Sequence, residues 1–344
     1  MQKNNFTNPL AIFDELWNAF DTIYSGFVVK GIDWDKLYHV YRNKIDEYTT
    51  ESQLFEVAKN MLSHLNDNHV KLKRDKTNQH FSAGSIGYII DKIGYDSTQK
   101  LFASKPVSNK YFPHGLNSLH GFSYGWLEDS IGYFHFGEFK NLEQTEETMH
   151  TIINYFSSSK AIIIDVRRNT GGDDRIGKTI ADCFADRKRK YMITSMKNGV
   201  AHNDFADAKA WFTEPKESVQ YLNPVVLLID NTTYSAAENF ALAMRELPQV
   251  SLVGDFTSGA FADADWKTLS CGWEVCIPYG VFTDKNGFCW EGIGIPPNYR
   301  VKTDPTKACE EKDAIIDFSL NLLKDISSKE TRSDQAFEQQ NLRP

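Results

Sequence analysis

Long hydrophobic runs and an excess of positive charge are both missing from this chain of 344 residues. No segment reaches the roughly eighteen unbroken apolar residues that a membrane-spanning helix needs, although 41% of the residues are hydrophobic. The formal net charge of −8 provides no basic field that would attract nucleic acid. We therefore expect a soluble globular protein with no transmembrane segment and no nucleic-acid partner.

Metal-ligand spacings are missing too. The five cysteines form no CxxC and no Cys/His pattern, so we predict no metal site and no cofactor; they are Cys183, Cys271, Cys276, Cys289 and Cys309. Because three of them lie within 271–289, one disulfide is allowed there in an oxidising compartment, and buried free thiols are the alternative. The first residues lack the apolar centre of a secretory signal, which leaves the location open from these residues alone.

The first part of the chain has helical periodicity. Asp33 and Ser52 are the predicted starts of the second and third helices. Val70 and Leu72 alternate with polar residues, so we expect His69 where a helix ends and a strand begins. These features predict a small helical domain over 1–73, with apolar residues recurring every three or four positions at Leu10, Phe13, Leu16, Trp17, Phe20 and Ile23, at Leu37, Val40, Tyr41 and Ile45, and at Leu54, Val57, Met61 and Leu62.

Residues 74–124 are polar and give a weaker signal, with short strands predicted at Ile86–Ile90 and Lys100–Ala103 in an irregular connection. From residue 125 strands and helices alternate, which favours an α/β layer fold over 125–326, followed by a polar tail over 327–344. The predicted strands are Ile131–Phe136, Ala161–Asp165, Val225–Ile229, Val250–Gly254, Thr268–Pro278 and Phe288–Trp290, with a tight turn at Lys285–Gly287, and the predicted helices are Glu143–Phe156, Arg175–Phe184 and Ala236–Arg245.

Ser235 follows the most apolar of these strands and opens a helix rich in small residues. There the unpaired N–H groups and the positive end of the helix dipole would face any negative charge that forms beside the serine oxygen, as a nucleophile requires. The alternative is a capping box, because Ser235 and Glu238 have the spacing in which the hydroxyl only closes the helix end.

Two glycines follow the predicted strand that ends at Asp165. Gly171 and Gly172 leave the backbone open to close approach by a ligand, as an oxyanion hole requires. A glycine-rich turn needed only for backbone geometry is the alternative.

Four segments in order resemble the tail-specific protease family of serine peptidases, also called peptidase family S41, which includes the C-terminal processing proteases and the tricorn core protease. The resemblance covers about Phe13 to Val301, and Gly31–Asp35 and Leu65–His69 are similar to the family's N-terminal helical region. The four motifs are Asp165–Gly172, Ser235–Glu238, Gly254–Gly259 and Glu291–Pro297. The resemblance implies a ClpP/crotonase-like core of ββα repeats with an N-terminal helical domain.

The family has two catalytic arrangements. One uses a lysine directly after the Thr-x-Gly turn, but Ala260 occupies that position here, and Lys267 is interpreted as a solvated strand residue. The tricorn-like branch uses a histidine and a glutamate, matched by His69 and Glu291. The resemblance therefore implies that Ser235 is the nucleophile, that His69 is the general base and that Glu291 orients the imidazole.

The resemblance also implies backbone donors for the oxyanion, the N–H of Ala236 and that of Gly171 or Gly172. Asp165, Arg167 and Asn169 are expected to brace the turn rather than to touch substrate. Many family members carry a PDZ domain of about 90 residues before the core, and the roughly 50 residues between Lys73 and Trp126 leave no room for a full one. Capture of substrate by strand addition at a sheet edge is the expected substitute.

These features predict a serine endopeptidase acting on polypeptides or peptides, with an oligomeric state that the sequence does not determine. A non-catalytic binding protein on the same fold and an esterase with the same Ser/His pair are the alternatives. Relatives of this kind are commonly exported, so we expect the cell envelope, with the cytoplasm as the alternative.

Overall fold

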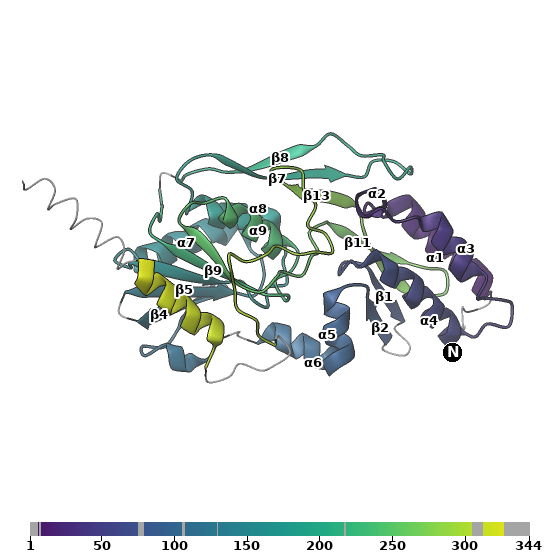
Figure 1. The fold of residues 1–344 in the computed structure, drawn as a ribbon, viewed down its shortest axis with the longest axis horizontal. Coiled ribbons are helices and arrows are strands. Elements are labelled where there is room, and N and C mark those ends of the chain that lie inside the picture. The colour runs from purple at the N-terminus through teal and green to yellow at the C-terminus, as the bar shows by residue number, and fades with distance from the viewer. Residues whose placement is uncertain are drawn as a thin grey trace, which may run out of the picture. The chain divides into compact units, whose positions relative to one another are not determined.

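The computed structural model describes residues 6, 8–74, 79–104, 107–128, 130–216, 218–304 and 312–326 (Figure 1). The chain divides into two compact units, and each unit is discontinuous in sequence. Unit 1 comprises residues 1–100, 190–212 and 257–295, and unit 2 comprises residues 101–189, 213–256 and 296–344. This division differs from the predicted consecutive segments because strands from late in the chain pair with a strand near residue 70.

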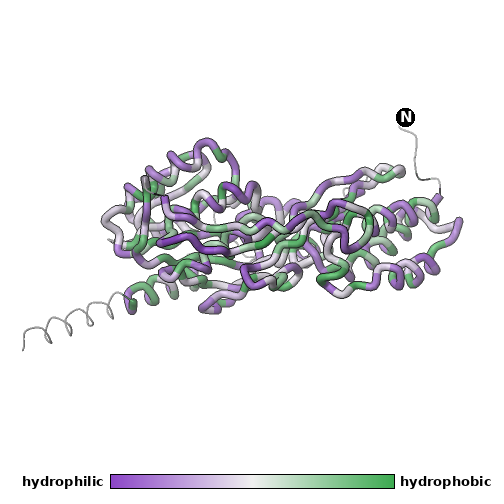
Figure 2. Tube along the Cα trace, turned by 90° about the horizontal axis from the view of Figure 1, so that it is seen from above, coloured by the Kyte–Doolittle hydropathy of each residue, from purple (hydrophilic) through white to green (hydrophobic). Residues whose placement is uncertain are grey.

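Unit 1 begins with helices that confirm the predicted helical periodicity. Asp33 caps one helix as predicted, whereas the last long helix begins with a capping box of Thr50 and Gln53 rather than at Ser52. Figure 2 shows hydrophobic and hydrophilic residues alternating along the helices beside the labelled N-terminal end, as in amphipathic helices. The elements are α1 (Pro9–Ile23), α2 (Phe27–Lys30), α3 (Trp34–Arg42), α4 (Glu51–Leu62) and the 3-10 helix η1 (Ser63–Leu65).

The sheet of unit 1 explains why the unit is discontinuous. Its four antiparallel strands have the order β11-β12-β1-β2, from β1 (Lys71–Arg74), β2 (Gln79–Ser82), β11 (Ala264–Thr268) and β12 (Glu274–Pro278). Leu72 of β1 lies opposite Val275 of β12, and both are buried in one apolar core with the helices. A second sheet has the order β13-β7-β8, from β7 (Arg189–Met196), β8 (Lys209–Thr213) and β13 (Gly280–Asp284).

Both strands predicted between residues 86 and 103 are wrong, since these residues form α5 (Ser85–Ile93) and α6 (Tyr95–Ala103). The run at Ile86–Ile90 fits strand alternation and helical spacing equally well. The structure resolves this in favour of the helix, because Ile86 and Ile89 are buried three positions apart while Tyr88 is 72% exposed.

Two other predicted strands differ from the structure. The segment Thr268–Pro278 is a hairpin in which β11 ends and β12 follows, with Gly272 at φ +89 in the turn. Phe288–Trp290 is not a strand. The carboxylate of Asp284 accepts bonds from the N–H of Phe288 and from Nε1 of Trp290, so these residues close the predicted turn at Lys285–Gly287 instead of pairing with a strand.

Unit 2 is built on a seven-stranded sheet of order β14-β10-β9-β6-β5-β4-β3. The neighbours from β5 to β14 pair in parallel, and β3, β4 and β5 pair antiparallel. The strands are β3 (Asn117–Leu119), β4 (Phe122–Glu128), β5 (Ile131–Phe136), β6 (Ala161–Asp165), β9 (Val225–Ile229), β10 (Val250–Gly254) and β14 (Tyr299–Arg300). The predictions for β5, β6, β9 and β10 are confirmed.

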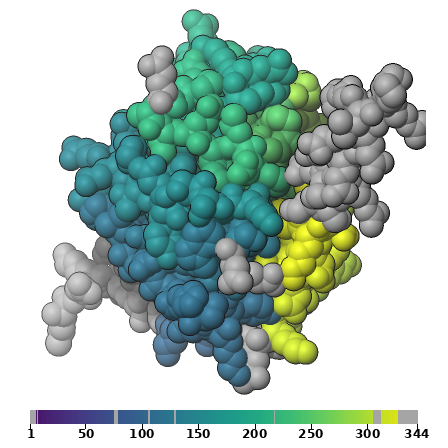
Figure 3. Space-filling view, turned by 90° about the vertical axis from the view of Figure 1, so that its left-hand side faces the viewer, coloured from purple at the N-terminus to yellow at the C-terminus, as the bar shows by residue number. Residues whose placement is uncertain are grey.

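Helices complete unit 2 and confirm the βα alternation: α7 (Leu142–Tyr155), α8 (Asp174–Asp182) and α9 (Ala236–Arg245), besides the 3-10 helix η3 (Asn109–Tyr111). A further helix spans residues 314–326, and Figure 3 shows its yellow residues at the surface. Its inner face packs Ile315, Ile316, Leu320 and Leu323 into one apolar cluster with sheet residues such as Ile163 and Leu228.

Two predictions from composition concern the described residues only. Among them, no helix is long and apolar enough to cross a membrane. Cys183, Cys271, Cys276 and Cys289 are free thiols, and the predicted alternative of buried free thiols fits the first three, since Cys289 is partly exposed. Cys309 lies outside the described residues.

Candidate functional site

Ser235 lies in unit 2 at the turn that joins β9 to α9. Its backbone has φ 59° and ψ −128°, a conformation that residues other than glycine rarely adopt and that costs about 1 to 3 kcal/mol. Its side chain accepts no bond from the start of α9, so the capping-box interpretation of the hydroxyl is wrong. A half-buried serine in strained backbone at a helix N-terminus has the geometry of a nucleophile held out of the helix.

Hydrogen bonds from the glycine turn hold the serine turn in this conformation. The N–H of Tyr234 donates to the carbonyl of Asn169 at 3.1 Å, and the N–H of Arg168 donates to Oγ1 of Thr232 at 2.8 Å. Thr233 Oγ1 donates to the carbonyl of Val166 at 3.0 Å. The two loops therefore form one braced structure, and Thr232 and Thr233 are parts of it that the sequence analysis missed.

The glycine turn lies directly against Ser235. A Cβ added at Gly171, where φ is +83°, would lie 2.6 Å from the Cβ of Ser235 and 2.9 Å from the N of Ala236. A Cβ at Gly172 would lie 2.2 Å from the carbonyl oxygen of Phe139. Side chains are therefore excluded at both positions for reasons of space as well as backbone conformation.

The structure distinguishes the N–H groups of the two glycines in the predicted oxyanion hole. The N–H of Gly171 donates to Oδ1 of Asn169 at 2.9 Å, so this N–H is already engaged. Within the described residues, the N–H groups of Gly172 and Ala236 donate to no protein group. These two groups are the available donors beside Ser235, and Gly171 contributes open space rather than a hydrogen bond.

His69 lies in unit 1, in the turn that links η1 to β1. The backbone N–H of His69 donates to Oδ1 of Asp67 at 2.9 Å, while Tyr24 donates its hydroxyl to Oδ2 of the same carboxylate at 2.9 Å. Lys30 Nζ lies 3.7 Å from Asp67 Oδ2 and donates to the carbonyls of Leu65 and Asn66. A buried carboxylate with three partners thus shapes the histidine turn, and the sequence analysis missed it although Asp67 stands two residues before the histidine.

Glu291 lies beside Asp67 and His69, although it comes much later in the sequence. Its Oε2 accepts the N–H of Phe261 at 2.8 Å. The ligand atoms of Asp67, His69 and Glu291 all lie within 4.8 Å of one another. The structure therefore brings together the predicted base and its predicted orienting group. The same three side chains are the ones that could hold a cation, but the ammonium of Lys30 already supplies positive charge beside Asp67.

Burial keeps the imidazole neutral. The largest effect is desolvation, which the charge of Asp67 opposes and the charges of Lys71 and Lys30 reinforce. Together they lower the pKa of His69 to about 4. At neutral pH the ring is therefore in the form that can accept a proton.

The structure also shows the two positions that bear on a lysine base. Ala260 is fully buried, and Lys267 is exposed in β11, as expected for a solvated strand residue. The structure thus places the predicted residues in two groups. Ser235, Gly171, Gly172 and Ala236 belong to unit 2, and His69 and Glu291 belong to unit 1.

Comparison with known protein families identifies the family of this chain. Residues 130–301 match the model of peptidase family S41, and residues 7–63 match the C1 domain of tricorn protease. The chain belongs to peptidase family S41. The predicted family is confirmed, and the two matches agree with the mixed α/β fold and its helical N-terminal region.

Two curated proteins that are similar in sequence to this chain are processing proteases. The carboxy-terminal processing protease CtpA of Bacillus subtilis is 29% identical over 144 residues, which cover 42% of this chain and 29% of that protein. The chloroplastic carboxyl-terminal-processing peptidase 1 of Arabidopsis thaliana is 25% identical over 172 residues, covering 50% of this chain and 33% of that protein. The match to this chain thus spans a third or less of each relative.

Solved structures are similar to this chain over more of its length than the two processing proteases are. A candidate peptidase from Parabacteroides merdae has 27% identity and a TM-score of 0.76, covering 92% of this chain and 96% of that one. Mature CPAF has 12% identity and a TM-score of 0.62, covering 85% and 92%. The tricorn protease has 16% identity and a TM-score of 0.57, covering 93% of this chain and 37% of that one. The last two likenesses concern the fold alone.

Proposed function

We propose that this chain is a serine endopeptidase that cleaves polypeptides through an acyl-enzyme on Ser235. The observation that carries the proposal is the strained backbone of Ser235, held beside two available backbone donors. Strain of this kind persists only where the surroundings enforce it, and it is common at sites of nucleophilic attack.

In the proposed first step Ser235 Oγ attacks the scissile carbonyl carbon while its proton passes to His69. The carbonyl oxygen becomes an oxyanion that accepts bonds from the N–H groups of Gly172 and Ala236. Each such donor stabilises the transition state by about 3 to 4 kcal/mol. His69 then gives the proton to the leaving amine, and the carbon–nitrogen bond breaks to leave an ester on Ser235.

In the second step His69 removes a proton from water, the hydroxyl adds to the ester carbon, and Ser235 leaves with the proton returned by His69. Glu291 stabilises the imidazolium that forms in each step. The buried neutral state of His69 and the nearness of the Glu291 carboxylate support these roles.

We further propose that substrate is bound by strand addition, since the segment between Lys73 and Trp126 leaves little room for a PDZ domain. The edge strand β11 supports this, because it is the end strand of its sheet and four of its five residues are exposed. An extended peptide could pair there through main-chain hydrogen bonds. Location in the cell envelope stays a prediction.

Labelling with a fluorophosphonate tests the proposal, with intact-protein mass spectrometry as the readout. We expect one adduct on the wild type and none on Ser235→Ala or His69→Ala, while Lys267→Met labels like the wild type because a lysine base is not used. An unlabelled wild type, or labelling that survives in Ser235→Ala, contradicts the proposal and favours the binding-protein alternative.

A matched ester and amide separate the peptidase from the esterase. The proposal expects hydrolysis of both and loss of both in Ser235→Ala. Hydrolysis of the ester alone favours the acyl-hydrolase alternative.

A further inference from the structure

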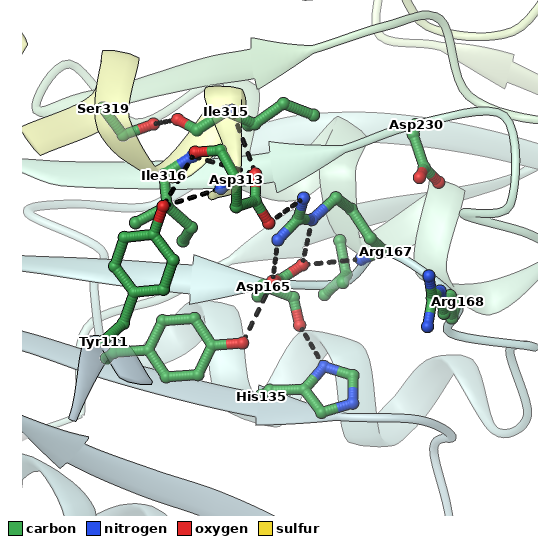
Figure 4. A network of polar contacts seen from close by, with 12 residues as sticks. Tyr111, His135, Asp165, Arg167, Arg168, Asp230, Asp313, Ile315, Ile316 and Ser319 are labelled. Carbon is green, nitrogen blue, oxygen red and sulfur yellow. Dashed lines mark hydrogen bonds and ion pairs between the residues drawn. The ribbon is translucent and has the colours of Figure 1, made fainter. Parts of the chain in front are cut away.

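A buried ion network joins the glycine turn of unit 2 to the helix of residues 314–326. Arg167 donates from Nε and Nη2 to the two carboxylate oxygens of Asp165, at 3.0 and 2.7 Å. Its Nη1 lies 2.8 Å from Oδ2 of Asp313 (Figure 4). The side chains of Arg167, Asp165 and Asp313 are 6%, 0% and 9% exposed. One guanidinium therefore bridges two carboxylates with little access to water.

Because its opposite charges offset one another, this network is sensitive to the loss of Asp313. Burial alone would raise the pKa of Asp165, but the charge and hydrogen bonds of Arg167 outweigh burial and leave that pKa below its usual value. Arg167 in turn faces both Asp165 and Asp313, and its pKa is raised well above the ordinary value because these carboxylates outweigh its own desolvation. Removing one carboxylate leaves a buried cation with half of its partners.

Asp313 connects the network to the helix. Its Oδ1 accepts the N–H groups of Ile315 and Ile316 at 3.0 and 3.2 Å, so this residue caps the helix while its Oδ2 binds Arg167. Tyr111 also holds this helix end, because its hydroxyl donates to Oδ1 of Asp317 at 2.8 Å and accepts the N–H of Asp313 at 2.6 Å. Asp313 and Asp317 therefore both hold the helix, but only Asp313 reaches Arg167.

From Arg167 the path to the oxyanion turn is short. The N–H of Arg167 donates to Oδ1 of Asp165 at 3.0 Å, and the next N–H, of Arg168, donates to Thr232. Asn169 follows, and its Oδ1 holds the N–H of Gly171. Side chains thus fix the N–H groups of residues 167, 168 and 171, and Asp313 anchors this stretch to the helix of residues 314–326.

We propose that Asp313 is a positioning residue for the oxyanion turn and acts through Arg167. This inference rests on the proposed function, because the turn matters for catalysis only if Gly172 donates to an oxyanion. Asp313 does not touch the glycine turn itself, so its loss loosens the turn without removing a donor. The consequence is a lower kcat with an almost unchanged KM.

The test compares Asp313→Asn with Asp317→Asn in the full chain. Asparagine is as good an N-cap as aspartate, so Asp313→Asn keeps the helix cap and removes only the ion pair with Arg167. Asp317→Asn is the matched control, because it removes the same charge from the same helix and leaves Arg167 untouched.

Hydrogen exchange of the segment 165–176, followed by mass spectrometry, is measured first. We expect roughly tenfold faster exchange in Asp313→Asn and wild-type rates in Asp317→Asn, since opening of the turn exposes the N–H of Gly171. Peptide hydrolysis should then show kcat reduced about tenfold and KM within about twofold in Asp313→Asn alone.

Equal exchange rates in the two variants, or faster exchange confined to residues 314–326, overturns the inference. A tenfold change in KM with kcat unchanged overturns it as well. If the wild type itself hydrolyses no peptide and takes no fluorophosphonate, the proposed function fails instead, and the exchange comparison still decides whether Asp313 holds the turn.

Discussion

The serine turn of unit 2 and the histidine turn of unit 1 are held in place by different forces. Around Ser235 the important contacts are made by backbone: glycines without side chains, a strained φ, and main-chain groups bonded to Asn169 and Thr232. Around His69 they are made by side chains: a buried imidazole, two carboxylates and the ammonium of Lys30.

The two turns should therefore differ in the kind of change that disrupts them. The serine turn should be sensitive to added atoms, because its glycines leave no space for a side chain and its donors are backbone N–H groups. The histidine turn should tolerate small changes of shape but respond to charge and to pH. Three predictions test this contrast: two concern activity, with the larger expected effect first, and the third concerns stability.

Gly171→Ala should give the largest effect. The added Cβ would lie 2.6 Å from the Cβ of Ser235 and would require an alanine at φ +83°. Loss of oxyanion alignment predicts a fall in kcat of about 100- to 1,000-fold, and the backbone strain predicts a loss of about 1 to 2 kcal/mol in the free energy of unfolding. Steady-state kinetics and urea unfolding measure the two.

Gly137→Ala is the matched control for this substitution, because a Cβ there meets nothing within 4 Å and its φ is not in the left-handed region. Wild-type kcat in Gly171→Ala would show that the glycine turn does not shape the oxyanion site.

Glu291→Gln should have a smaller effect. The glutamine carbonyl can still accept the N–H of Phe261, so the loop is kept and only the charge is lost. A carboxylate within 4.8 Å of the imidazolium is worth about 3 kcal/mol at an effective dielectric constant near 20. We therefore expect kcat to fall by roughly 100-fold.

Glu274→Gln, a change of the same kind in β12, should leave kcat unaltered. Equal activity of the two variants would show that Glu291 serves only the loop.

The third prediction concerns the pH dependence of stability. His69 has a folded-state pKa of about 4 against an ordinary value of 6.5, so the unfolded chain binds this proton more readily. The stabilisation from neutral His69 is complete above pH 6.5 and is lost as the pH falls to about 4, a total of about 3 kcal/mol.

Urea unfolding at pH 7.5 and 4.5 measures this dependence in the wild type and in His69→Asn. The variant should lose less stability on acidification than the wild type, and His39→Gln, a change at an exposed histidine, should behave like the wild type. Identical pH slopes in wild type and His69→Asn would mean that His69 is not buried in the neutral form.

Local patterns were enough to predict the chemistry-bearing segments of unit 2. The apolar strand before Ser235, the small-residue helix after it and the glycines after β6 each depend on neighbours within a few residues, so periodicity and turn chemistry predict them. The same local reading failed for residues 85–103, because short apolar runs fit a strand and a helix equally well until burial distinguishes them.

The sequence by itself therefore determined which residues carry chemical groups and which segments are strands or helices with long, regular patterns. Only the tertiary structure decided that Asp67 lies beside His69 and Glu291, that Asn169 engages the N–H of Gly171 and leaves Gly172 available, and that Asp313 reaches Arg167. Such pairings depend on close contacts between segments far apart in the chain, and hydrogen bonds of about 3 Å are set by packing rather than by local periodicity.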